Sequence, residues 1–380
     1  MSNPWSDWIP GVLSKRQLRE LCKTSYIIGA KEGDSFFDQS SIDLTLSGEG
    51  YLLTKGAIKP QGSFLAFVNR EKDLLEKLEF KDGQFLLEAK KTYVFKLEQQ
   101  LNTELKTSPI YGQATAKSSI GRLDVLARLI VDGMDRYEGF APERIASGEM
   151  FLEITPLTFN VFVKPGISLS QLRLFYGKIE NSIIRGDELF ETVLPGGEHD
   201  GCLTVDLSDA KASKNSSDLG AAFCAGSDSD KEPICLWKTD APPDPKKYWK
   251  LMKAEPIGSK KRIIIEKDAF YILRSKQKIA LTGGVAVYCR ATDETIGEMR
   301  IHYAGFVHPF FGRERTDGNI GTPLIFEVRG HDLRVILNDG EKMAQLEFYR
   351  MSEDCDPEKK EDDKYKEQTL QLSNFFAEWK

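Results

Sequence analysis

Residues 114–124 bring two cations, two adjacent hydroxyls and a glycine into one short segment, a combination that suits phosphate binding. Lys117 and Arg122 can neutralise phosphate charge, while the hydroxyls and backbone N–H groups can donate hydrogen bonds to phosphate oxygens. The two hydroxyls belong to Ser118 and Ser119. The G-x-x-x-x-G-K-[ST] pattern of a Walker A loop is missing. A serine-rich turn with exposed cations has the same composition, so the residues alone leave both interpretations open.

Glu327 is the first candidate for proton transfer. It lies within the apolar run 324–328. Apolar surroundings desolvate a carboxylate, raise its pKa and suit it to general acid–base catalysis. The other interpretation is an outward-facing polar residue of an alternating strand. Glu153 has the corresponding place in the first half of the chain, with the same two interpretations.

Few residues suit a transition metal. The four histidines are His199, His302, His308 and His331, and neither H-E-x-x-H nor the H-x-E…P-C-x-x-C pattern of zinc deaminases occurs. The six cysteines are scattered and form no C-x-x-C pair. We therefore expect no zinc site, reduced thiols and a cytoplasmic protein.

The composition excludes several classes of protein. The chain has 380 residues, of which 41% are hydrophobic and 29% charged, so it can bury a core without disulfides. A formal net charge of −6 argues against a globally basic nucleic-acid binder. We find no pattern of a signal peptide or a membrane span. The length predicts two or three domains.

The hydrophobic pattern predicts a β-rich fold with few helices. Residues 14–17 form a capping box, and apolar residues follow at helical spacing, so a helix is predicted to begin there. Further on, strand-length apolar runs separated by glycine or proline predict an all-β barrel or sandwich. These runs are residues 41–46, 84–88, 92–96, 150–154 and 159–163. A helix is predicted over residues 71–77, and the polar residues 210–230 are predicted to form a loop.

The second half of the chain repeats the first. Four segments recur in the same order, which indicates a duplicated domain. They are residues 38–47 with 200–208, 85–94 with 270–279, 151–154 with 326–328, and 163–172 with 337–346. We predict a first domain over 1–195 and a second over 196–352. Residues 353–380 begin with a charge run and end in apolar residues, which predicts a mobile tail with an apolar anchor over 372–376.

Together these segments resemble the dCTP deaminase branch of the trimeric dUTPase fold, in its long bacterial form. That resemblance implies two tandem dUTPase-like β-barrel (β-clip) domains. Residues 117–122 resemble the family's Arg-Ser-Ser-x-x-Arg triphosphate loop, with lysine replacing the first arginine. Residues 303–309 resemble its Ala-Gly-Phe-Ile-Asp-Pro hairpin, which holds base and sugar, although His308 replaces the aspartate. Residues 363–368 resemble its C-terminal Lys-Tyr-x-x-x-Gln segment, one residue shorter here.

The resemblance also implies a composite site, because the family takes loop and hairpin from different subunits. The first half keeps the serine loop and the second keeps the hairpin, so Glu327 is the predicted catalytic residue, with the tail as a lid. The opposite combination, Glu153 with Arg290 and Thr292, looks degenerate and is the alternative. The backbone near Ala304 is implied to hold the water. The predicted substrate-binding residues are Lys117, Ser118, Ser119, Arg122, Ala304, His308, Ile325, Phe326, Lys364, Tyr365 and Gln368.

The implied reaction is hydrolysis of dCTP to dUTP and ammonia with a glutamate base, with Mg²⁺ accompanying the triphosphate. The alternatives are a dUTP pyrophosphatase, an enzyme with both activities, and a non-catalytic nucleotide-binding protein. A dUTPase normally closes its site with a glycine-rich C-terminal motif, and this chain has no glycine after Gly340. The resemblance further implies dTTP as an inhibitor and a homo-oligomer, with no nucleic-acid polymer or membrane as a partner.

Overall fold

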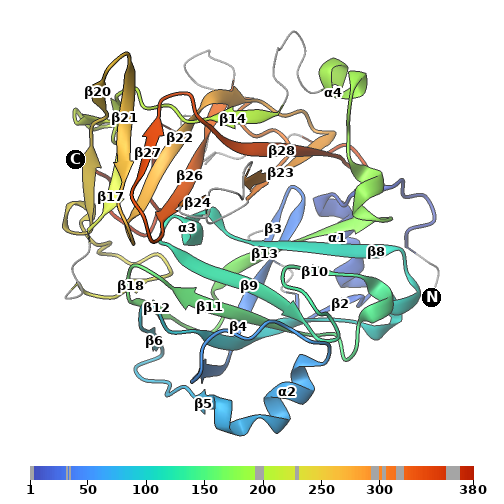
Figure 1. The fold of residues 1–380 in the computed structure, drawn as a ribbon. Coiled ribbons are helices and arrows are strands. Elements are labelled where there is room, and N and C mark those ends of the chain that lie inside the picture. Colours follow the sequence, from blue (N-terminus) through green and yellow to red (C-terminus); the bar gives the residue numbers. More distant parts are fainter. Residues whose placement is uncertain are drawn as a thin grey trace.

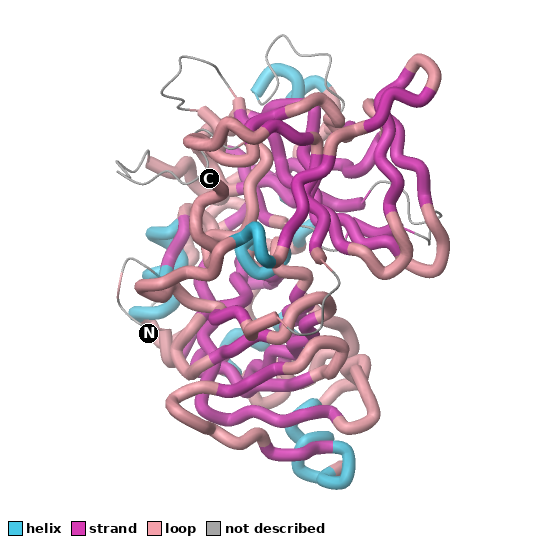
Figure 2. The backbone as a smooth tube through the Cα atoms, turned by 90° about the vertical axis from the view of Figure 1, so that its left-hand side faces the viewer, coloured by secondary structure: helices cyan, strands magenta, loops and turns pink. Residues whose placement is uncertain are grey.

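Two strand-rich halves lie one above the other in the computed structural model of the chain (Figures 1 and 2). The structure describes residues 4–30, 33, 36–192, 201–226, 231–291, 299–301, 305–313, 321–356 and 369–380. Figure 1 shows the first half below, in blue to green, and the second above, in yellow to red. The prediction of a mainly β fold built from two similar domains is confirmed.

An 11-stranded sheet forms the first half. Its main path is, in order, β10 (Gly139–Phe140), β8 (Ile110–Ala116), β13 (Ser168–Tyr176), β4 (Ser41–Leu53), β7 (Tyr93–Leu101), β11 (Glu149–Pro156) and β9 (Val125–Val131). Off this path, β1 (Gly11–Val12) pairs with β13, β2 (Ile27–Ile28) with β7, and both β3 (Phe37–Asp38) and β5 (Leu75–Lys77) with β4. The N–H of Glu138 donates to the Leu129 carbonyl of β9 at 2.8 Å, and its carbonyl accepts from Ala114 of β8 at 2.8 Å. The sheet is thereby nearly closed into a barrel.

The second half repeats this strand order in two smaller sheets. One contains, in order, β14 (Cys202–Thr204), β28 (Lys342–Arg350), β23 (Val285–Ala291) and β25 (Phe306–Val307). The other contains β19 (Trp249–Met252), β17 (Ala222–Ala225), β22 (Phe270–Ile279), β26 (Thr322–Gly330) and β24 (Met299–Ile301). A bridge between Val205 and Ser275 joins β14 to β22. The path β25-β23-β28-β14-β22-β26-β24 therefore corresponds strand by strand to the path of the first half.

Three small sheets and a few short helices complete the fold. The sheets are β6 (Phe85–Leu87), β12 (Val161–Val163) and β18 (Ile234–Cys235); β20 (Glu255–Ile257), β21 (Lys260–Ile265) and β27 (Val335–Asn338); and β15 (Ala210–Lys211) with β16 (Leu219–Gly220). The α-helices are α1 (Lys15–Lys23), α2 (Phe64–Arg70), α3 (Ser118–Gly121) and α4 (Asp187–Thr192). The 3₁₀ turns are Lys72–Leu74, Thr103–Thr107, Pro142–Arg144, Ile179–Ser182 and Pro245–Lys247.

Matching hydrogen bonds establish which residues of the two halves correspond. The side-chain carbonyl of Gln99 accepts from the Thr45 N–H at 2.7 Å, and that of Gln277 accepts from the Thr204 N–H at 2.7 Å. Such a side chain occupies backbone donors where two strands separate. These contacts equate β4 with β14 and β7 with β22.

The same comparison equates the two candidate glutamates. Glu153 lies opposite Val94 in the β11–β7 pair, and Glu327 lies opposite Ile272 in the β26–β22 pair. Val94 and Ile272 each follow a tyrosine whose hydroxyl accepts a backbone N–H, from Glu88 at 2.9 Å and from Glu266 at 3.1 Å. The two glutamates therefore occupy one position of the repeated fold.

Two of the four predicted sequence matches hold in register. Residues 163–172 match 337–346, since Gly166 and Gly340 both have φ of 81° and donate to the corresponding strands β4 and β14 at 2.8 and 2.9 Å. The match of 151–154 with 326–328 aligns the glutamates. The other two join the right parts of the fold in the wrong register: the counterpart of Thr45 is Thr204, and that of Phe85 is Ile263. The side-chain hydrogen bonds of Gln99 and Gln277 and of Tyr93 and Tyr271 fix the correct offset between the halves.

The helix predicted to begin at the capping box is confirmed. The Ser14 hydroxyl accepts from the Gln17 N–H at 3.2 Å, and the Gln17 side chain accepts from the Ser14 N–H at 3.0 Å, at the start of α1. The helix predicted over 71–77 is wrong. The helix is α2, which ends at Arg70, because residues 75–77 pair with β4 instead. The stretch 210–230 contains β15, β16 and β17 rather than a plain loop.

Apolar packing joins the two halves. Val12 and Phe175 of the first half form one buried cluster with Ala286 and Tyr349 of the second. The C-terminal residues 369–380 add a second junction. Leu370, Leu372, Phe376 and Trp379 are all buried, so the predicted apolar anchor is confirmed and extends to Trp379. At the start of the predicted tail, Cys355 is buried and Glu353 forms an ion pair with Arg16.

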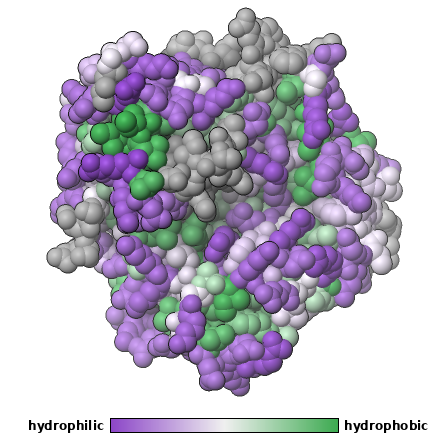
Figure 3. Space-filling model, in the orientation of Figure 1, coloured by the Kyte–Doolittle hydropathy of each residue, from purple (hydrophilic) through white to green (hydrophobic). Residues whose placement is uncertain are grey.

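The surface is largely hydrophilic (Figure 3). At the upper left of this view, apolar side chains gather over β21 and β27, where Ile264 and Ile336 are exposed. Across the described ranges, no helix has the length and apolar character needed to cross a membrane.

Candidate active site

The serine loop lies between the two halves. Helix α3 follows β8 as a single turn, and in Figure 1 it lies at the centre of the molecule, close to β24 and β26. The N–H of Lys117 donates to the Leu169 carbonyl at 3.0 Å, and Ile120 is fully buried beneath the turn. After the turn, Asp124 has a φ of 57°, and strand β9 begins at the next residue. Ser118 and Ser119 are half-buried, and Lys117 forms an ion pair with Asp43.

Glu327 of the second half faces Arg122 of the first. The Nε of Arg122 lies 3.9 Å from Oε1 of Glu327, and both side chains are 7% exposed. Burial raises the pKa of Glu327 to about 7, and the positive charge of Arg122 opposes that rise. A carboxyl group with a pKa near neutrality exchanges protons readily at physiological pH. The structure thus brings together the loop cation and the strand glutamate that the sequence predicted to share a site.

A second charge pair lies beside the first. Arg329 forms an ion pair with Asp124, and the Thr158 hydroxyl donates to the same carboxylate at 2.6 Å. Arg329 and Glu327 are two residues apart on β26 and therefore share one face of the strand. Burial raises the pKa of Asp124, and Arg329 counteracts this. Two charge pairs therefore fasten β26 to the residues that follow β8. Sequence reasoning missed Asp124, Thr158 and Arg329.

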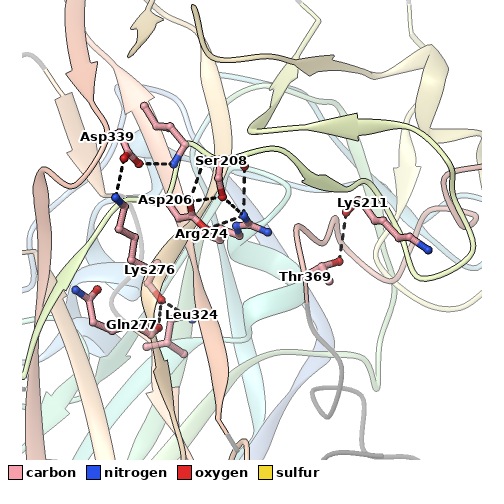
Figure 4. Close-up of polar contacts among 11 residues, drawn as sticks. Asp206, Ser208, Lys211, Arg274, Lys276, Gln277, Leu324, Asp339 and Thr369 are labelled. Atoms are coloured by element: carbon pink, nitrogen blue, oxygen red, sulfur yellow. Dashed lines mark hydrogen bonds and ion pairs between the residues drawn. The ribbon is translucent and has the colours of Figure 1, made fainter. Parts of the chain in front are cut away.

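The beginning of β26 is fixed by a polar network (Figure 4). A bulge in β22 follows Arg274, and there the Ser275 hydroxyl donates to the Gln277 carbonyl at 2.6 Å and accepts from the Leu324 N–H at 3.0 Å. Arg274 forms an ion pair with Asp206 at 2.6 Å. These contacts fix the strand just before Glu327.

Alternation along β26 separates two of the predicted binding residues. Ile325 is half-buried on the face of Glu327 and packs against the hydrophobic cluster that joins the core of the first half to Phe270 and Ile272 of the second. Phe326 points the other way and is 1% exposed, within the core of the second half. Phe326 can therefore reach a ligand only through its backbone.

Glu153 lies in a different environment from its counterpart. It is buried and forms an ion pair with Arg128 of its own half. The Tyr137 hydroxyl donates to its other oxygen at 3.0 Å, and the Arg128 guanidinium lies 4.3 Å from the centre of the Tyr137 ring. Both oxygens of this carboxylate are therefore bonded directly within the first half. Arg290 of the alternative site pairs with Glu347 at 3.1 Å, and Thr292 lies outside the described residues.

His308 lies at the junction of the halves. Its Nδ1 is 2.9 Å from the Ser40 hydroxyl and its Nε2 is 3.8 Å from an Asp38 oxygen, both in the first half. Its side chain is 17% exposed. Ala304, in the same predicted hairpin, lies outside the described residues.

The C-terminal segment contacts the serine loop. The Ser373 hydroxyl donates to the Ser119 carbonyl at 2.7 Å, and Arg122 donates to the Gln371 carbonyl at 3.4 Å. The sequence predicted a lid in the tail and an apolar anchor at its end, but not these two hydrogen bonds. The predicted lid residues Lys364, Tyr365 and Gln368 lie outside the described residues.

Comparison with known proteins now assigns the family. The model of the 2'-deoxycytidine 5'-triphosphate deaminase N-terminal domain matches residues 9–178, and that of the C-terminal domain matches residues 198–376. The chain belongs to the dCTP deaminase family. A crystal structure of 2'-deoxycytidine 5'-triphosphate deaminase from Agrobacterium tumefaciens is similar to it, with a TM-score of 0.78 and 23% identity over 90% of this chain and 99% of that one. A search of curated proteins returned no match.

Membership of this family makes the chain an enzyme that acts on dCTP, as the sequence predicted. Within the part of the chain that the structure describes, no group of three or more histidine, cysteine, aspartate or glutamate side chains is arranged to hold a metal ion.

The raised pKa of Glu327 links stability to pH. The folded-state value of about 7 exceeds the ordinary value of 4.5, so the folded state binds this proton more tightly than the unfolded state. The stabilisation is complete below about pH 4.5 and is lost as pH rises through 7, by up to about 3 kcal/mol. Glu327→Gln removes this term. Urea unfolding at pH 5 and pH 8 should show wild type losing stability relative to the variant, and an unchanged difference would contradict the prediction.

The buried pair of Asp124 and Arg329 gives a second prediction. Arg329→Met leaves the carboxylate buried without its cation, and we expect a loss of about 3–5 kcal/mol in unfolding free energy. Adding Asp124→Asn should recover part of that loss, because the amide carries no charge. Arg334→Met serves as the control, since the Arg334 and Glu266 side chains of that pair are 73% and 45% exposed. The control should change stability by less than about 0.5 kcal/mol. Equal effects of the two single variants would refute the assignment.

Proposed function

We propose that this chain hydrolyses dCTP to dUTP and ammonia at the junction of its two halves, with Glu327 as the general base. The 3.9 Å approach of Glu327 to Arg122 carries the proposal, because it brings a proton-transfer group to the loop that would bind phosphate. Both residues come from the same chain. The near-neutral pKa of about 7 supports the assigned role.

The proposed reaction needs one base and one water. Glu327 takes a proton from water as the water oxygen bonds to C4 of cytosine. The same carboxyl group passes this proton to N3, then takes the proton of the new C4 hydroxyl and delivers it to the amino group. The C4–N bond breaks, ammonia leaves and a carbonyl forms at C4. Backbone groups near Ala304 are proposed to orient the water. No electron transfer occurs, and the atoms of water and dCTP account for both products.

Triphosphate binding is assigned to the serine loop. Lys117 and Arg122 supply positive charge, and Ser118 and Ser119 supply hydroxyl groups on a single turn of helix. Asp43 and Asp124 are each paired with a cation, so the nearby carboxylates suit charge balance better than metal binding. We propose that Mg²⁺ arrives with the triphosphate and is bound mainly by phosphate oxygens and water. Lys364, Tyr365 and Gln368 are proposed to close over the phosphates.

His308, Ile325 and the backbone of Phe326 complete the proposed site on the side of base and sugar. Several properties belong to the same proposal and are inferred from the family resemblance: a homo-oligomer, inhibition by dTTP and a cytoplasmic location. A dUTP pyrophosphatase, alone or combined with deamination, remains the alternative.

Product analysis tests the assignment of the base. Wild type, Glu327→Gln and Glu153→Gln are incubated with dCTP and Mg²⁺, and ammonia and nucleotides are quantified. We expect Glu327→Gln to lose at least about 10²-fold in kcat, the usual contribution of a general base. Glu153→Gln should keep kcat within a few-fold at a temperature where it remains folded. Loss of activity in Glu153→Gln alone would reverse the assignment, and dUMP with pyrophosphate would identify a bifunctional enzyme. A wild type that releases no ammonia would overturn the proposal.

The pH profile gives an independent test. The base must be ionised in the free enzyme, so kcat/KM should fall about tenfold per pH unit below about pH 7. Arg122→Lys keeps a positive charge and should preserve this limb of the profile. A profile that stays flat down to pH 5 would exclude Glu327 as the titrating base.

A further inference from the structure

Arg173 is a completely buried cation at the junction of the halves. It lies on β13, with an exposed fraction of 0%. Its guanidinium donates to two carbonyls of the second half, that of Val287 at 2.9 Å and that of Val307 at 3.3 Å. It also donates to the Ser40 hydroxyl of the first half at 3.3 Å and lies 4.0 Å from the centre of the Phe306 ring.

Burying the Arg173 guanidinium costs free energy. Among the described residues, Arg173 forms no ion pair, and its hydrogen-bond acceptors are all neutral. Burial accordingly lowers the pKa of its guanidinium. The charge of Asp38 opposes part of this effect without a direct ion pair. A buried cation that lacks a direct carboxylate contact is unfavourable, and an apolar side chain of similar size would pack there at lower cost. Stability alone therefore does not account for an arginine here.

The contacts of Arg173 converge on His308. Val307, whose carbonyl accepts from Arg173, directly precedes His308 in the chain. Ser40, the other acceptor, holds Nδ1 of His308 at 2.9 Å. One guanidinium therefore fixes both the backbone that carries the histidine and the hydroxyl that orients its ring.

The duplicated fold shows that this device exists at only one of the two equivalent positions. In the matched segments, Arg173 follows Leu172 and its counterpart Glu347 follows Leu346. Glu347 accepts from the Tyr349 hydroxyl at 2.6 Å and pairs with the exposed Arg290. The arginine thus occurs where it can contact the hairpin of the second half.

We propose that Arg173 is a positioning residue of the deaminase site, which holds β25 and His308 against the first half so that the hairpin can receive the nucleoside. This rests on the proposed function, in which the hairpin binds base and sugar. Arg173 touches neither substrate nor reacting atoms in this proposal. It acts through Ser40 and the two carbonyls.

The test compares Arg173→Met, Arg173→Lys and Ser40→Ala by steady-state kinetics with dCTP, well below each melting temperature. Loosening the hairpin weakens substrate binding more than the chemical step, so we expect KM to rise about tenfold for Arg173→Met, a change of about 1.4 kcal/mol. kcat should change by less than threefold. Arg173→Lys should recover part of the affinity. Ser40→Ala should raise KM without a large loss of stability, so the test survives a poorly folded Arg173→Met. Arg350→Met, which alters an exposed pair with Glu188, is the matched control and should leave KM unchanged.

Each outcome decides the inference. If Arg173→Met and Ser40→Ala melt earlier but keep the wild-type KM, Arg173 is structural only and the inference is wrong. The inference is also wrong if kcat falls while KM stays constant. If wild type binds dCTP but releases no ammonia, the proposed function fails, while the same variants measured by calorimetric dCTP binding still test the positioning role. A wild type that neither binds nor deaminates dCTP overturns both.

Discussion

Buried charge across the junction of the two halves is the constraint on which the rest of the structure depends. Arg122 and Asp124 belong to the first half. Glu327 and Arg329 lie on one face of strand β26 in the second half. Each charge is desolvated, so each needs its partner from the other half, and neither half can satisfy its own charges alone. The paired groups therefore help to determine how the halves dock, and docking in turn brings the serine loop of the first half beside Glu327 of the second.

The duplicated fold contains two equivalent positions for a strand glutamate. The contacts of Glu153 and Glu327 show how the two halves differ at this position. Glu153 and Glu327 hold one position of the repeated strand order, yet Glu153 receives an arginine and a tyrosine hydroxyl from its own half. Glu327 faces an arginine at 3.9 Å, without such close bonds. The carboxylate of Glu153 is bonded directly within its own half, whereas burial raises the pKa of Glu327 to about 7, where a carboxyl group can take and release a proton near neutral pH. A similar asymmetry separates Arg173 from Glu347.

Much of the fold and of the candidate site could be predicted from the sequence, for identifiable reasons. Periodicity and glycine-bounded runs predict strands, and the repeat of Glu153 and Glu327 could be found because both lie in short apolar segments. The resemblance to dCTP deaminases then predicted that the Arg122 loop and Glu327 would meet. Register was harder, because similar apolar and polar runs match at more than one offset, and the side-chain hydrogen bonds that fix the correct one become visible only in the structure. The pairing of Asp124 with Arg329 and the burial of Arg173 depend on how the halves dock. From the sequence alone, an isolated charged residue in a strand is predicted to be solvent-exposed.

The same burial that gives Glu327 its proposed chemistry also makes it a cost to the fold. At neutral pH the ionised carboxylate is desolvated and only partly compensated by Arg122, whereas the neighbouring pair of Asp124 and Arg329 is closer and receives a further hydrogen bond from Thr158. The pair of Asp124 and Arg329 holds β26 against the first half, so the contact between Glu327 and Arg122 need not be short. The two adjacent charge pairs therefore have different roles. The pair of Asp124 and Arg329 joins the two halves, and the pair of Arg122 and Glu327 carries the proposed proton-transfer group, so one strand serves both purposes.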